Sequence, residues 1–184
     1  MHLPLGVEGH ALDQNSALKH IQGIGQLIFP PGFKQQIGLF ATPTNRQTKQ
    51  AQLRQQHSRS ASEWIVFFGE NKCAVGWFYG YMEDEESFFI DTIGLIPEYR
   101  GAGIYTAFLA RLQEYLKAKG YERLSTSHMP NNRGALIADL KAGFTIVGME
   151  LDESHGIQVK LAYSLYDDRR RAFERVFSVE PEEK

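Results

Sequence analysis

A glycine-containing turn at residues 97–105, Pro-Glu-Tyr-Arg-Gly-Ala-Gly-Ile-Tyr, constrains the fold of this chain more than any other segment. An apolar segment runs into the turn, and residues 103–119 then place apolar side chains at helical spacing. The pattern predicts a strand, a tight turn and a helix. Gly101 and Gly103 would let backbone N–H groups approach a ligand closely, and the first helical turn adds partial positive charge. The sequence therefore predicts a seat for a phosphate or a diphosphate at this turn.

The segments on both sides of the turn predict a mixed sheet. Strands are expected over residues 64–68, 73–82 and 87–96, and short turns make them an antiparallel meander. After the helix of residues 103–119 we expect a strand over 122–128, a helix over 132–141, strands over 144–151 and 157–165, and a short amphipathic helix over 166–177. The first long helix is long enough to be a crossover between parallel strands. We expect an α/β (α+β mixed) fold in a single domain of residues 1–184, with helices on both faces of the sheet.

The first third of the chain carries weaker patterns. Residues 1–16 show no period and are expected to be loose, and Gly23 and Gly25 leave the state of residues 18–29 open. Residues 34–40 could form a strand. Residues 45–58 are rich in Gln, Arg and Lys and predict a polar helix. The last residues, 178–184, are expected to be frayed.

Composition excludes several classes of protein. The net charge of −2 shows none of the basic excess typical of nucleic-acid binding. A single cysteine, Cys73, excludes an internal disulfide framework and suits a reducing compartment. The longest apolar run, residues 64–68, is far shorter than the ~20 residues of a membrane helix. Residues 1–6 lack the features of a signal peptide, so we expect a cytoplasmic protein with no membrane or nucleic-acid partner. The histidines lack ligand spacing, and we expect no metal site.

Two motifs at the expected separation resemble the GCN5-related N-acetyltransferase (GNAT) family. The first is that family's acetyl-CoA motif, between a strand and a helix, and the second lies in the next helix and strand. The matching residues are Arg100, Gly101 and Gly103 in the first motif, and Asn132, Ala135, Gly143 and Phe144 in the second. The resemblance covers roughly residues 64–165.

The resemblance implies an acetyl-CoA-dependent N-acetyltransferase, with the coenzyme as co-substrate and no metal. The acetyl group would pass to a primary amine of a small molecule or a protein by direct attack in a ternary complex. Dimers are common in the family, so a homodimer is possible. The alternative is a non-catalytic acyl-CoA-binding or sensor module on the same fold. A third alternative, an unrelated nucleotide-binding α/β domain, follows from the glycine turn alone.

The same resemblance implies how the coenzyme would be held. Leu95 would offer its backbone N–H to the thioester carbonyl, an interaction commonly worth ~3 kcal/mol when it is aimed at developing negative charge. The side-chain amide of Asn132 would hold the pantetheine arm. The full set of expected coenzyme-binding residues is Leu95, Ile96, Arg100, Gly101, Ala102, Gly103, Ile104, Tyr105 and Asn132.

Two positions depart from the family pattern. Tyr105 stands where the family has a small residue, so its side chain must point away from the ligand. Asp139 stands where many relatives have a tyrosine that protonates the leaving thiolate. The usual general acid is therefore missing, and its role is not transferred to Asp139. This gap is the reason to keep the non-catalytic alternative.

Three residues are candidates for proton transfer. Asp91 lies in an otherwise apolar strand, where burial would strengthen it as a base; a structural hydrogen bond is the alternative. His128 ends a strand that should flank the cleft, and histidine titrates near neutral pH; an exposed strand end is the alternative. Tyr163 could act as an acid or line the acceptor site, or could be core. The aromatic residues of the second strand, Trp77, Phe78, Tyr79 and Tyr81, could likewise wall an acceptor pocket or fill the core.

Overall fold

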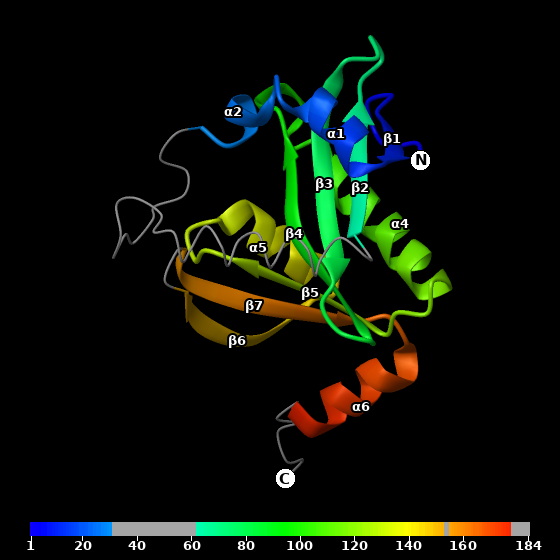
Figure 1. The fold of residues 1–184 in the computed structure, drawn as a ribbon. Coiled ribbons are helices and arrows are strands. Elements are labelled where there is room, and N and C mark those ends of the chain that lie inside the picture. The colour runs from blue at the N-terminus through cyan, green and yellow to red at the C-terminus, as the bar shows by residue number, and fades with distance from the viewer. Residues whose placement is uncertain (31–61, 153–154, 178–184) are drawn as a thin grey trace, which may run out of the picture.

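The computed structural model describes residues 1–30, 62–152 and 155–177, and Figure 1 shows their arrangement. The strand expected over residues 34–40, the polar helix expected over 45–58 and the frayed end expected over 178–184 lie outside the described residues. The rest of the chain forms a mixed sheet with helices packed against it.

The sheet of the described residues has seven strands in the order β1-β2-β3-β4-β5-β7-β6. Their bounds are β1 Glu8–Leu12, β2 Ser62–Phe68, β3 Ala74–Met82, β4 Ser87–Leu95, β5 Arg123–His128, β6 Thr145–Asp152 and β7 Gly156–Ser164. Strands β2, β3 and β4 form the expected antiparallel meander, and β4 pairs with β5 in parallel. The predicted mixed sheet is confirmed.

The helices expected over residues 103–119, 132–141 and 166–177 lie close to where their patterns place them, and the chain forms further helices that no pattern predicted. Their bounds are α1 Gln14–Ile21, α2 Gly25–Ile28, the 3-10 helix η2 Pro97–Tyr99, α4 Ile104–Ala118, α5 Arg133–Lys141 and α6 Asp167–Phe177. The expectation that residues 1–16 are loose is wrong, because β1 and the start of α1 fall within them. Strand β1 pairs with β2 through its backbone, and its side chains are mostly exposed, so no apolar alternation marks it in the sequence.

Helices cover both faces of the sheet, as expected. Neighbouring strand residues point to opposite faces. On one face the ring of Phe67 on β2 meets that of Phe108 on α4, with centroids 5.0 Å apart. On the other face Val66 and Trp77 pack with Ala17 of α1 and with α2. Two apolar clusters therefore lie on opposite sides of the strands.

Strands β4 and β5 pair over only part of their lengths. The pairing runs from Ser87 with Arg123 to Ile90 with Thr126 and then stops. A register shift against β3 falls at the same level of β4 and leaves Asp91 without a partner in the ladder. In Figure 1, β5, β7 and β6 run across the direction of β2, β3 and β4. The sheet is thus open between residues 91–95 of β4 and the end of β5.

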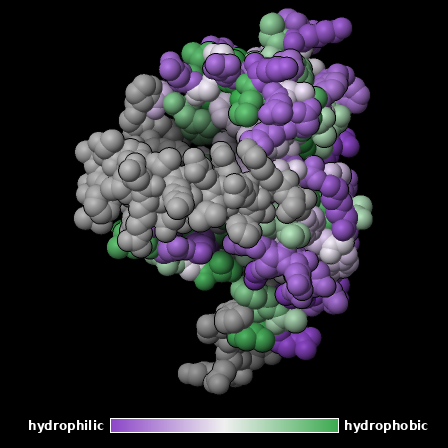
Figure 2. Space-filling view, in the orientation of Figure 1, coloured by the Kyte–Doolittle hydropathy of each residue, from purple (hydrophilic) through white to green (hydrophobic). Residues whose placement is uncertain are grey.

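The part of the described surface that is visible in Figure 2 is mostly polar. On the face in Figure 2, hydrophilic residues cover most of the described surface, and hydrophobic residues form small separate patches. None of the described helices is long and apolar enough to cross a membrane. The C-terminal helix α6 is tied to the rest by Arg169, which pairs with Glu86 at 2.9 Å and with Glu122.

Candidate active site

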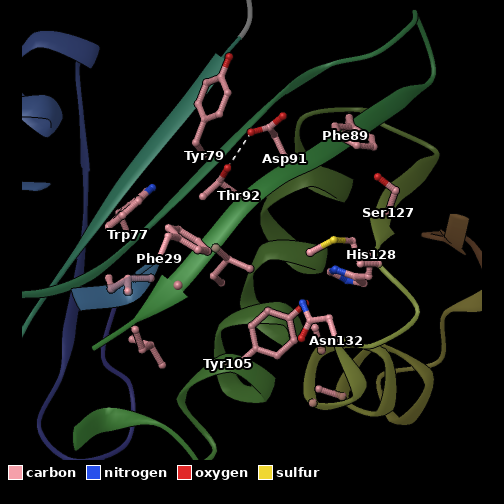
Figure 3. A pocket seen from close by; sticks show the side chains of 18 of the residues that line it. Phe29, Trp77, Tyr79, Phe89, Asp91, Thr92, Tyr105, Ser127, His128 and Asn132 are labelled. Carbon is pink, nitrogen blue, oxygen red and sulfur yellow. Dashed lines mark hydrogen bonds between the residues drawn. The ribbon is translucent and has the colours of Figure 1, made fainter. Parts of the chain in front are cut away.

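The opening between β4 and β5 belongs to a cavity of about 1430 Å³. The described residues that line it include those of β4, of the glycine turn and the start of α4, of the end of β5 and of the start of α5, and others come from α2, β2, β3, β6 and β7. Figure 3 shows Tyr105, His128 and Asn132 on the α4, β5 and α5 side, with Asp91 and Thr92 on β4. We call this cavity the pocket.

The glycine turn presents unpaired backbone amides. Gly101 and Gly103 have φ of 74° and 77°, a left-handed conformation that glycine adopts without strain. Gly103 caps α4, and the first helical N–H with a helical acceptor is that of Ala107, bonded to the Gly103 carbonyl at 3.0 Å. Among the described residues, no hydrogen bond takes up the amides of residues 101–106. A Cβ built on either glycine meets no atom within 4 Å. The turn therefore has both the free donors and the space that a diphosphate needs.

Arg100 connects this turn to the backbone of β4 and α2 through hydrogen bonds. Its Nε donates to the Leu95 carbonyl at 2.8 Å, and its Nη2 donates to the Ile28 carbonyl of α2 at 3.1 Å. Its own amide donates to the Pro97 carbonyl at 3.1 Å. The side chain and the amide are thus already engaged, so the free donors of the expected seat begin at Gly101.

The amide of Leu95 faces the opening. The next residue, Ile96, donates its N–H to the Val75 carbonyl of β3 at 2.9 Å. Because bonded and non-bonded residues alternate in an antiparallel pair, the N–H of Leu95 points away from β3. Its carbonyl, which accepts from Arg100, lies on that same side. Of the two strand residues expected to bind a coenzyme, Leu95 therefore has an available amide, while the amide of Ile96 is used in the sheet.

The other expected coenzyme residues divide between the pocket and the core. Asn132 lines the pocket at the start of α5, and its side chain makes no capping hydrogen bond, so its amide group is available. Ile104 and Tyr105 line the pocket as well. Ala102 packs against the main apolar cluster, and its contribution to a seat is through its backbone alone.

A buried carboxylate joins two side chains that line the pocket. Asp139 of α5 is 0 % exposed. One of its oxygens accepts from the Tyr105 hydroxyl of α4 at 2.5 Å, and the other lies 2.6 Å from Nε2 of His128, at the end of β5. Burial raises the pKa of Tyr105 well above its usual 10, and the charge and hydrogen bond of Asp139 raise it further. We call Tyr105, His128 and Asp139 the proton cluster.

The sequence does not predict that the members of the proton cluster meet. Tyr105 and Asp139 are separate departures from the pattern of the family that the chain resembles, and His128 is an independent candidate. The structure shows that the Tyr105 hydroxyl donates to the Asp139 carboxylate. The one signal in the sequence is that both departures place a polar group where the family pattern has a different residue.

The remaining catalytic candidates lie apart from this cluster. Asp91 is exposed rather than buried, because the irregularity in β4 turns it outward; it lines the pocket and accepts from the Thr92 hydroxyl at 2.7 Å. Tyr163 is not among the described residues that line the pocket. Its ring lies 5.5 Å from that of Phe144, and its hydroxyl accepts from Arg170 at 3.4 Å.

The aromatic residues of β3 serve both roles that the sequence left open. Phe78 is fully buried in the core. Trp77, Tyr79 and Tyr81 line the pocket. The rings of Tyr79 and Tyr81 lie 5.9 Å apart, and the first also lies 4.3 Å from Trp64 of β2. These rings form an aromatic wall beside Asp91.

Comparisons with known proteins agree with this geometry. Residues 33–144 match the model of the acetyltransferase (GNAT) family. No curated protein matches the chain. Among solved structures, the spermidine/spermine N-acetyltransferase SpeG from Vibrio cholerae is similar, with a TM-score of 0.60 and 15% identity over 90% of this chain and 96% of that chain. Nourseothricin acetyltransferase has a TM-score of 0.52 and 19% identity over 58% of this chain and 66% of that chain. At these identities the structural likeness shows a shared fold.

Proposed function

The chain belongs to the GNAT family of acetyltransferases, whose members use acetyl-CoA as co-substrate, and we propose that it transfers the acetyl group to the nitrogen of a primary amine. The observation that carries this proposal is the set of free amides at residues 101–106, beside the point where β4 leaves β5. This arrangement offers a diphosphate seat next to the opening between the two strands. The coenzyme would thus be held mainly by backbone groups.

Each expected contact with acetyl-CoA has a hydrogen-bond donor in the chain. The amides of Gly101 to Tyr105 would take the diphosphate, helped by the positive end of α4. The side-chain amide of Asn132 would hold the pantetheine arm. The amide of Leu95, turned toward the gap, would donate to the thioester carbonyl, and such a donor is commonly worth ~3 kcal/mol when negative charge develops on the oxygen. Acetyl-CoA supplies the activated acetyl group when it is bound.

The chain must also take a proton from the acceptor. An alkyl amine with a pKa of ~10.4 is mostly protonated at neutral pH and cannot attack until it loses a proton. His128 lines the pocket at the end of β5, and its side chain is 12% exposed. We assign it as the general base, which accepts the amine proton directly or through one water. Asp91 is exposed in the same pocket, and in this proposal it attracts the cationic amine.

The residues that line the pocket favour a small cationic amine as acceptor. Trp64 and Tyr79 contact each other in the aromatic wall with their rings tilted, and Glu83 and Asp91 add carboxylates to the same pocket. Aromatic faces and carboxylates together attract ammonium groups. The names of the structural neighbours, a spermidine/spermine N-acetyltransferase and a nourseothricin acetyltransferase, support the same substrate class.

One experiment separates the proposal from its alternative. Calorimetric titration with acetyl-CoA measures binding, and release of free thiol measures transfer across a panel of diamines, polyamines, aminoglycoside-type amines and lysine peptides. The proposal predicts saturable binding and amine-dependent thiol release, with mass spectrometry of the product showing an N-acetyl group. Tight binding without thiol release from any amine would favour the acyl-CoA-binding module. No binding at millimolar acetyl-CoA would refute both.

A further inference from the structure

The carboxylate of Asp139 is the most completely enclosed charged group among the described residues. It has no exposed surface, and each of its oxygens meets one polar partner. The partners come from different elements, since Tyr105 opens α4 and His128 ends β5. A buried carboxylate without such partners would be strongly destabilising. The two contacts are therefore required by the fold, and they also determine the chemistry of the partners.

The contacts of Asp139 determine which ring nitrogen of His128 carries the proton. A carboxylate accepts hydrogen bonds and donates none. The Tyr105 hydroxyl keeps its proton at neutral pH, because burial raises its pKa well above 10, and it donates to one oxygen. The other oxygen, 2.6 Å from Nε2 of His128, must then meet an N–H. The neutral ring is thus protonated on Nε2, and its lone pair is on Nδ1.

We propose that Asp139 is the positioning residue of His128, fixing the ring with Nδ1 as proton acceptor, and that Tyr105 holds the carboxylate in place. This inference rests on the proposed function, in which His128 takes the amine proton. The ammonium group loses one proton to Nδ1, and the neutral amine then attacks the thioester carbon, so that a carbon–nitrogen bond forms. The carbon–sulfur bond breaks with its electron pair going to sulfur, and the second nitrogen proton passes through water to the departing thiolate. His128 later releases its proton to water. The charge of Asp139 stabilises the imidazolium in between.

Other titratable groups share the pocket with His128. Asp91 lies on β4, Lys160 of β7 is paired with Glu150 of β6 at 2.5 Å, and His155 is paired with Asp152 at 2.8 Å. Glu83 and Arg100 are further charged residues among the described ones that line this pocket. Because all of these groups are identical in the wild type and in an Asp139 variant, a difference between the two pH profiles reports the carboxylate.

The first test measures the tautomer and needs no substrate. Long-range nitrogen–proton NMR spectra of protein with isotope-labelled histidine distinguish the two neutral forms of an imidazole. The His128 signal is assigned as the one missing from His128→Gln. We expect the form protonated on Nε2 in the wild type and a mixture of forms in Asp139→Asn. A wild-type ring protonated on Nδ1 would overturn the inference, whether or not any variant folds.

The second test measures turnover. Asp139→Asn should lower kcat about 10²- to 10⁴-fold, the range of a general acid–base contribution, and leave the KM for acetyl-CoA within about two-fold. The shape of its pH profile should differ from that of the wild type, because the ring loses its hydrogen-bonded carboxylate. Tyr105→Phe keeps the carboxylate and should lower kcat only about 3- to 10-fold, the effect of one lost hydrogen bond.

Matched controls separate local from general effects. Asp167→Asn on α6 and Tyr115→Phe on α4 make the same chemical changes at exposed positions and should leave kcat unchanged. Thermal unfolding of each variant checks that it is folded. If the wild type is inactive on every amine, the proposed function is wrong, and the NMR spectra still test the tautomer of His128. An active wild type with an equally active Asp139→Asn would overturn the inference alone.

Discussion

The two walls of the pocket are made of different parts of the chain. On the glycine-turn wall, the groups that face the gap are backbone amides of residues 101–106 and of Leu95. On the second wall, where the start of α4 meets the end of β5, the functional groups are side chains from three elements. They are Tyr105, whose amide belongs to the first wall, and His128, with Asp139 of α5 buried behind them. The first wall depends on the path of the backbone. The second depends on the identity of each side chain and on the packing that brings α4, β5 and α5 together.

This difference determines how each wall responds to substitution. A backbone amide survives most side-chain changes, so the coenzyme seat fails only when bulk or charge enters it. A side-chain cluster fails when one member changes, even if the shape of the pocket is kept. Binding and catalysis should therefore be separable by mutation, one wall at a time.

The largest effect is expected from Gly103→Glu. The new side chain adds bulk and negative charge where the diphosphate is proposed to lie, so acetyl-CoA binding should be lost at millimolar concentration, as measured by calorimetry. Gly120→Glu is the matched control at the other end of α4. Gly120 also has a positive φ, 92°, and open space for a Cβ, so the backbone strain, roughly 1 kcal/mol or more, is shared. Equal affinities of the two variants would contradict the backbone seat.

A smaller effect is expected on the other wall from His128→Gln. Loss of the general base should lower kcat about 10²- to 10⁴-fold and keep the affinity for acetyl-CoA within about two-fold. Steady-state kinetics and calorimetry measure the two quantities separately. His2→Gln, at a side chain that is 86% exposed, is the control. Coupled losses of affinity and kcat in His128→Gln would show that the two walls are not separable.

Asn132→Ala should have a modest effect on binding. It removes one proposed hydrogen bond to the pantetheine arm, and a net 0.5–1.5 kcal/mol corresponds to an affinity loss of roughly 2- to 10-fold. Helix α5 should be little affected, since this side chain makes no capping hydrogen bond. The neighbouring Asn131→Ala is the control, because Asn131 is not among the described residues that line the pocket. An unchanged affinity in Asn132→Ala would remove this contact from the proposed seat.

The smallest effect concerns the ionisation of Tyr105. Its pKa lies well above 10 in the folded chain, so it keeps its proton while exposed tyrosines ionise. A raised pKa means that the stability it supports is complete below about pH 10 and falls as the pH rises above that value. Ultraviolet titration of the folded wild type minus Tyr105→Phe should show one phenol that ionises late. A difference spectrum that titrates with the exposed tyrosines would contradict the buried contact with Asp139.

The sequence predicted the parts of the fold that strong local patterns encode. The helix expected over residues 103–119 is α4, Ile104–Ala118, and the strand expected over 73–82 is β3, Ala74–Met82. Strand β1 was missed because its pairing with β2 uses backbone groups and leaves few buried side chains to produce a pattern. Apolar periodicity reports burial, and an edge strand buries little.

The candidate site divides in the same way. The glycine turn is contiguous, so its residues and their spacing could be read directly. The proton cluster joins residues that are 34 and 11 positions apart, and its geometry depends on how α5 packs beside α4. The prediction that Asp91 is buried is wrong, because an irregularity between β3 and β4 turns this residue outward. No local sequence pattern predicts that irregularity.

A crystal structure of the protein with acetyl-CoA bound tests the central claim most directly. We expect the diphosphate oxygens within hydrogen-bonding distance of the amides of residues 101–105 and the thioester carbonyl against the amide of Leu95. A coenzyme bound elsewhere, or these amides bonded to other parts of the chain in the complex, would contradict the account.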